Sequence, residues 1–85
     1  MIVVMLTRRH DEAVAHARLA GLAMRDVLVP GSDNQVLRGL RLTDADLIVE
    51  FPSFDHHPHR DDIRAELFVV LARSRANPPW ERLGR

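Results

Sequence analysis

The densest run of side chains that could do chemistry lies at residues 55–62, Asp-His-His-Pro-His-Arg-Asp-Asp. Imidazoles and carboxylates are common ligands of zinc and similar ions, so His56, His57 and His59 are candidate metal ligands. Neighbouring histidines cannot easily aim at one ion, however, and Pro58 stiffens the segment. We therefore favour a solvated loop that leads into a helix. A pH-sensitive patch is a variant of this interpretation, because histidine titrates near about 6.5.

A second candidate site follows the first apolar run of the chain, at Thr7, Arg8, Arg9 and His10. These residues open an expected helix, where free backbone N–H groups and two guanidinium groups would attract an anion. The alternative is a solvated helix start that carries charged side chains. The sequence contains neither a phosphate-loop pattern nor G-x-G-x-x-G, so nucleotide hydrolysis through that chemistry is not predicted.

Glu50 is the one charged residue in an otherwise apolar run, Leu47–Phe51. A carboxylate near the end of a buried strand can bind a metal or activate water, as acids do in nucleotide hydrolases. The alternative, which we favour, is that Glu50 emerges at the strand end and pairs with Arg8 or Arg9.

Two parts of the chain are candidates for a protein contact. The run 68–72 is apolar, and so small a sheet cannot cover every side of the helix that carries it, which makes Phe68 and Val69 candidate interface residues. Trp80 is the only tryptophan. It could fold back over the end of the core or anchor a partner, as exposed aromatic side chains often do.

Three short apolar runs predict strands at Ile2–Leu6, Val27–Val29 and Leu47–Phe51. A first helix is expected over 13–20, with Thr7 as a cap and Gly21 as the stop. A short turn of helix is expected at 34–38, capped by Ser32 or Asp33. A longer helix is expected to begin at Pro58 and to end at Asn77-Pro78-Pro79.

Strands joined by helical crossovers are expected to run parallel. The fold class is therefore α/β: a minimal Rossmann-like three-layer unit, with a three-stranded parallel sheet in the order 2-1-3 and helices on both faces. We expect residues 1–77 to form this single domain and residues 78–85 a short C-terminal tail.

In open parallel sheets, ligands bind outside the carboxyl ends of the strands, where the strand order reverses. The polar residues that follow the three strands should meet at that edge, and Ser53, Asp55, His56 and His57 follow the third strand there. The predicted anion-binding set consists of Thr7, Arg8, Arg9, His10, Ser32 and Glu50.

Composition excludes several kinds of chemistry. The chain has no cysteine, which removes thiol catalysis and thiolate metal sites, and its twelve basic residues are all arginine, which removes a lysine Schiff base. No spacing of serine, histidine and aspartate supports a catalytic triad. We predict no catalytic residue and no cofactor.

Charge and hydropathy narrow the choice of partners. The formal net charge is zero, which argues against a nucleic-acid partner and against a polybasic membrane surface. The sequence shows no apolar run of about 20 residues that could span a membrane and no signal peptide pattern. A cytoplasmic protein that binds a protein partner or forms a homo-oligomer is expected.

The segments 2–9, 25–30, 36–40 and 45–50 resemble small accessory proteins of actinobacterial phages, which look like a truncated P-loop-like α/β core. The resemblance spans roughly residues 2 to 75, and Val49-Glu50 looks like the acidic strand end of that fold. Thr7–His10 stands where the phosphate loop would be, so hydrolysis is not implied. The resemblance implies a non-structural phage protein that acts in the host cytoplasm on host or phage proteins.

These observations rank the functions. The first hypothesis is a non-enzymatic interaction or regulatory protein that self-associates or binds a host or phage protein. The second is a small anion- or nucleotide-binding module at the strand-end edge. The third is a metal-dependent enzyme that uses Glu50 and the His56–Asp62 run, and nucleic-acid binding comes last.

Overall fold

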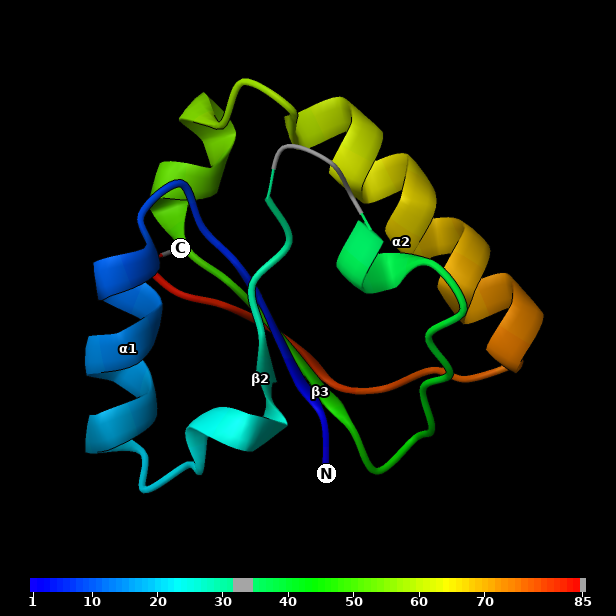
Figure 1. Cartoon of the computed structure of the whole chain (residues 1–85), viewed down its shortest axis with the longest axis horizontal. Coiled ribbons are helices and arrows are strands. Elements are labelled where there is room, and N and C mark those ends of the chain that lie inside the picture. Colours follow the sequence, from blue (N-terminus) through cyan, green and yellow to red (C-terminus); the bar gives the residue numbers. More distant parts are fainter. Residues whose placement is uncertain (32–34, 85) are drawn as a thin grey trace.

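A computed structural model describes residues 1–31 and 35–84 of the chain. The described part is an α/β fold with a parallel sheet and two α-helices (Figure 1). The predicted cap at Ser32 or Asp33 lies outside these residues, and the short helix expected beside it is a 3-10 turn at Gln35–Leu37.

The sheet contains four parallel strands in the order β2-β1-β3-β4. They span β1 Val3–Leu6, β2 Val27–Leu28, β3 Leu47–Glu50 and β4 Trp80–Arg82. The order 2-1-3 and the parallel direction were predicted, but the prediction of three strands was wrong. Trp80–Arg82, which we expected in a tail, pairs with β3 in the register Ile48–Trp80 and Glu50–Arg82.

Side chains alternate between the two faces of the sheet, because successive residues of a strand point to opposite sides. On one face, α1 (His10–Leu19) approaches through Ala13 and Ala17, whose small side chains pack with Val3 and Met5 of β1. On the other face lies α2 (Arg60–Ser74). Figure 1 shows the two helices on opposite sides of the strands.

The core beneath α2 is the larger one. Strands β1 and β3 supply Val4, Leu6 and Ile48 to it. Buried partners come from α2 and from the segments around it: Leu37, Leu42, Phe54, Ile63, Leu67 and Val70. All four residues of β1 are buried, which explains why this strand carries no polar side chain.

The end of α1 follows the predicted signal. Gly21 has φ +71°, a left-handed conformation that glycine adopts without a steric penalty. The amide of Leu22 donates to Ala17 O at 2.8 Å, and that of Gly21 donates to Arg18 O at 3.2 Å. These two bonds close the helix as a Schellman motif. At the other end Arg9, not Thr7, is the N-cap residue.

Asp46 fixes the start of β1 beside the start of β3. Its Oδ1 accepts from the backbone of Ile2 at 2.7 Å, and its Oδ2 accepts from the backbone of Thr43 at 2.7 Å and the Thr43 hydroxyl at 3.2 Å. Burial alone would raise the pKa of this carboxyl, but the hydrogen bonds from Ile2 and Thr43 and the nearby N-terminal charge together lower the pKa below its usual 3.8.

Asp46→Asn should lower the free energy of unfolding by about 2 kcal/mol at pH 7, because a charged acceptor is lost. The pKa of Asp46 is lower in the folded chain than in the unfolded one. The stabilisation is therefore fully present above about pH 4 and is lost as the pH falls through the folded pKa. Urea unfolding at pH 7 and pH 3 measures this, with the exposed Glu81→Gln as control. An equal deficit at both pH values would contradict the assignment.

Candidate functional site

The turn after β1 is tied to the segment after β3. The hydroxyl oxygens of Thr7 and Ser53 lie 3.0 Å apart, and the Arg8 backbone donates to Ser53 Oγ at 3.2 Å. Thr7 is buried, and its Oγ1 also accepts from the Arg9 backbone at 3.0 Å. Thr7 therefore holds the chain between β1 and α1, and its hydroxyl oxygen already has protein partners.

Thr7 and Arg8 precede α1, Arg9 is its N-cap residue and His10 is its first residue. The Arg9 guanidinium bonds both carboxylate oxygens of Asp11, with the Nη2–Oδ2 distance at 2.8 Å and the Nε–Oδ1 distance at 3.3 Å. Ser32 lies outside the described residues. An anion site at this edge stays a prediction, with one of its guanidinium groups already engaged.

Glu50 has no exposed surface, although it is charged and stands at the end of β3. Its Oε2 accepts from Nη2 of Arg64 on α2 at 3.0 Å, and its Oε1 accepts from Nε1 of Trp80 on β4 at 3.2 Å. The favoured sequence interpretation named Arg8 or Arg9 as the partner. The structure assigns that role to Arg64, whose guanidinium carbon also lies 5.5 Å from the centre of the Phe54 ring.

The Glu50 cluster, made of Glu50, Arg64 and Trp80, joins α2 and β4 to the carboxyl end of β3. A buried carboxylate is stable only when its oxygens are paired, so each contact constrains the element that provides it. The sequence did not reveal this cluster, because Arg64 stands in a helix with several other arginines. The spacing of residues in α2 did indicate that Arg64 lies next to the buried side of the helix, since it directly follows the buried Ile63 and precedes Leu67 by three residues.

Arg64→Met should lower the free energy of unfolding by about 3 kcal/mol, because it removes a guanidinium that is hydrogen-bonded to the buried Glu50 carboxylate. Urea unfolding followed by the fluorescence of Trp80, the only tryptophan, measures the change. The matched control is Arg41→Met, at an exposed arginine. Equal stability of the two variants would show that the Glu50–Arg64 pair does not hold α2 in place.

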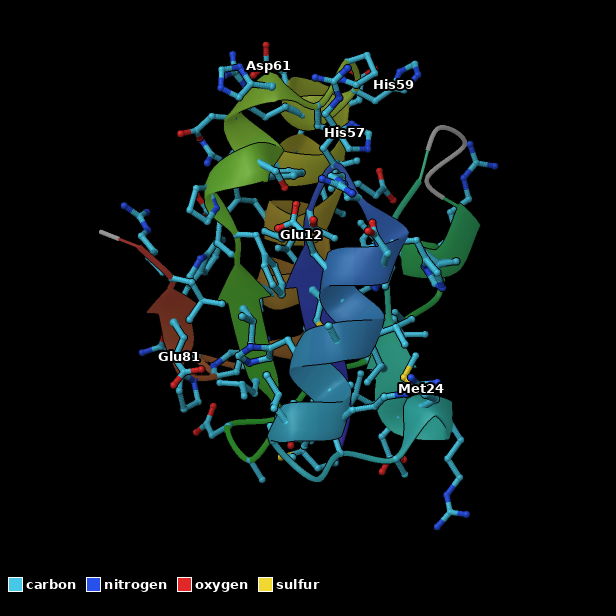
Figure 2. The ribbon with its side chains drawn as sticks, turned by 90° about the vertical axis from the view of Figure 1, so that its left-hand side faces the viewer. Glu12, Met24, His57, His59, Asp61 and Glu81 are labelled. Atoms are coloured by element: carbon cyan, nitrogen blue, oxygen red, sulfur yellow. The ribbon has the colours of Figure 1, made fainter. Side chains whose placement is uncertain are left out.

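The histidine-rich run forms the turn before α2 and the helix start. A cavity of about 240 Å³ lies there, lined by His57, Pro58, His59, Arg60, Asp61 and Asp62. Figure 2 shows His57, His59 and Asp61 at the same end of the molecule. Within residues 1–31 and 35–84, no three His, Cys, Asp or Glu side chains are grouped so that they could hold a metal ion.

His57 is held as a neutral acceptor. Its Nδ1 accepts from the backbone of His59 at 3.0 Å, and its ring lies 5.8 Å from the Phe54 ring, centre to centre. Burial lowers the pKa of His57 below 6.5, and the nearby His59 and Arg8 lower it further. The pH-sensitive patch stays a prediction, to which His57 would contribute because protonation of Nδ1 would remove its hydrogen bond.

The ring of His57 should titrate below pH 6.5, which NMR of the histidine Cε1–H resonances measures directly. Stability that depends on the neutral ring is complete above the unfolded value of about 6.5 and is lost as the pH falls toward the lower folded pKa. The variant His57→Asn keeps an acceptor and does not titrate, so its stability should fall less between pH 7 and pH 5. A titration midpoint above 6.5 would refute this description.

The outward side of α2 carries apolar residues between charged ones at its two ends. Ile63, Leu67 and Val70 are buried beneath the helix, yet Phe68 is 57% exposed and Val69 is 51% exposed. Ala65 and Ala72 are also exposed and lie on the same outer side by helical spacing. We call Ala65, Phe68, Val69 and Ala72 the outer face of α2. Folding of the single chain therefore leaves two neighbouring large apolar side chains, Phe68 and Val69, more than half uncovered on this face.

Trp80 connects this face to the Glu50 cluster. Its ring is half-buried against the core under α2, and its centre lies 6.2 Å from that of the Phe68 ring at a tilt of 33°. The indole nitrogen of Trp80 donates to Glu50, and its ring packs against the core, so Trp80 covers the end of the core. The same ring also lies beside the exposed Phe68, next to the candidate contact surface.

The other large exposed apolar side chains in the described residues belong to separate segments. Met1 precedes β1, Leu19 ends α1, Met24 precedes β2 (Figure 2), and Val36 lies in the turn at 35–37. Single exposed apolar residues are normal on protein surfaces, whereas large contiguous apolar patches are typical of contact sites. Of the surfaces described, the outer face of α2 is the strongest candidate for a functional contact.

Comparison with known proteins adds no relative. No protein-family model, no curated protein and no solved structure matches the chain. Neither α1 nor α2 is long and apolar enough to cross a membrane, and the same holds for every helix in the described residues.

Proposed function

We propose that this chain is a non-enzymatic protein-interaction module that contacts its partner through the outer face of α2. The observation that carries the proposal is the adjacent pair Phe68 and Val69, each more than half exposed on a helix whose opposite side is fully buried. Folding of the single chain gains only part of the available burial from these two side chains, because it leaves more than half of each in water. Burial against another protein would remove that apolar surface from water.

Charge supports a protein partner over a polyanion. The formal net charge is zero, and the outer face of α2 is flanked by acidic residues in the first turn of the helix and by a basic residue in the last turn. Protein contacts typically have such an apolar centre with a polar rim. The resemblance to accessory proteins of actinobacterial phages fits this role, with a Rossmann-like unit that acts in the host cytoplasm on host or phage proteins.

Site-specific photo-crosslinking in an actinobacterial host tests the proposal. Benzoylphenylalanine in place of Phe68 should form protein adducts, whereas the same group in place of Leu19, which is 91% exposed on α1, should form several-fold fewer. Val69→Asp should abolish the adducts formed from position 68, because a carboxylate would have to be desolvated in the contact. Equal yields from positions 68 and 19 would contradict a contact through α2.

A further inference from the structure

We propose that the outer face of α2 binds a second copy of this chain, with the two α2 helices packed antiparallel about a two-fold axis that passes between Phe68 and Val69. This inference rests on the proposed function, that the face is a protein contact. It goes further because it names the occupant and its orientation.

The apolar residues of the outer face of α2 are placed symmetrically about the pair Phe68 and Val69. Ala65 precedes Phe68 by three positions, and Ala72 follows Val69 by three positions. In an antiparallel pair centred between Phe68 and Val69, Ala65 of each copy lies opposite Ala72 of the other. Alanine at both ends of the contact lets the helix axes approach to the short end of the usual 8–10 Å range. The large side chains meet at the centre.

Exposed charges of opposite sign stand at the two ends of α2. Asp61 and Asp62 lie in the first turn of α2, whereas Arg73 and Arg75 lie at its end, and all four residues are exposed. An antiparallel pair places the aspartates of each copy beside the arginines of the other, and it also opposes the helix dipoles favourably. A parallel pair would bring like charges together.

The existing contacts of these charged groups leave them accessible. Asp61 lies 3.4 Å from Nε of Arg60, but its side chain is 88% exposed. Arg73 donates to the carbonyl oxygen of Leu40 at 3.1 Å through one of its guanidinium nitrogens, which leaves four further N–H donors. Both groups can therefore take a partner from a second copy without a change in the fold.

The proposed contact is small. The 15 residues of α2 span about 22 Å at 1.5 Å per residue. A contact between two such helices is smaller than the roughly 1,200–2,000 Å² of a standard stable interface. The dimer should therefore dissociate in the micromolar range or above. The zero net charge removes any overall repulsion between the copies.

Disulfide trapping tests the arrangement, because the natural chain has no cysteine. Ala65→Cys and Ala72→Cys are prepared separately, one of them ¹⁵N-labelled, and mixed under mild oxidation. The antiparallel pair predicts rapid formation of the mixed-mass dimer and slow formation of either homodimer. A disulfide needs its two Cα atoms within about 7 Å, so distant pairs do not form. Ala15→Cys, at an exposed alanine of α1, mixed with Ala72→Cys gives the background.

Sedimentation of the unmodified chain across a concentration series completes the test. Reversible doubling of mass together with the mixed disulfide supports the proposal. Homodimers of Ala65→Cys in preference to the mixed species would overturn the antiparallel arrangement. A single-chain mass at all concentrations, with only background disulfide, would overturn the second copy. The proposed function would still stand in that case if position 68 crosslinks to a different protein, and it would fall if position 68 crosslinks to none.

A charge exchange provides an independent check. Asp62→Arg alone and Arg73→Asp alone should each weaken dimerisation at least several-fold, because like charges would then meet across the contact. The double variant Asp62→Arg/Arg73→Asp should restore much of it. Circular dichroism and melting temperature confirm that each variant is folded. A double variant no better than the worse single variant would count against the antiparallel pairing.

Discussion

Glu50 is a carboxylate without exposed surface at the end of β3, and the fold can hold it there only because its oxygens are hydrogen-bonded. Arg64 reaches it from α2 and Trp80 from β4. The two contacts fix elements that are distant in the sequence to one strand end. The rotation of α2 about its own axis and the position of β4 at the edge of the sheet both depend on these contacts.

The rotation of α2 about its own axis is one consequence. When Arg64 reaches Glu50 and Ile63 and Leu67 pack on the sheet, helical geometry leaves positions 65, 68, 69 and 72 on the outside. Phe68 lies beside Trp80, but more than half of its surface and of that of Val69 stays exposed. This exposed apolar surface is the basis of the association that we propose.

Much of the fold could be predicted, because continuous apolar runs bounded by turn residues are strong signals in a parallel sheet. Strand β4 was missed for a physical reason. Its two exposed residues, Glu81 and Arg82, carry no pattern of burial, and the strand follows Pro78 and Pro79, which usually end regular structure. Trp80 is drawn into the sheet by its bond to Glu50, a contact over 30 positions that local patterns do not show.

For the candidate sites, too, only part of the arrangement could be predicted from the sequence. The position of Thr7–His10 at the strand ends followed from topology, and the exposure of Phe68 and Val69 followed from the limited area of the sheet. The hydrogen-bond partners of individual polar groups could not be predicted from the sequence. Thr7 meets Ser53, and Glu50 meets Arg64 rather than the arginines nearest the first strand end, because such choices depend on the packing angles of α2 and the 52–56 turn. Sequence spacing alone does not determine those angles.

Glu50 holds α2 through Arg64, and we propose that a second copy of the chain covers the outer face that this leaves exposed. Amide NMR spectra of the ¹⁵N-labelled chain over a dilution series test it most directly. We predict concentration-dependent shifts at Ala65, Phe68, Val69 and Ala72, with the amides of α1 unchanged. Spectra that do not change with concentration, or changes confined to α1 and β2, would contradict it.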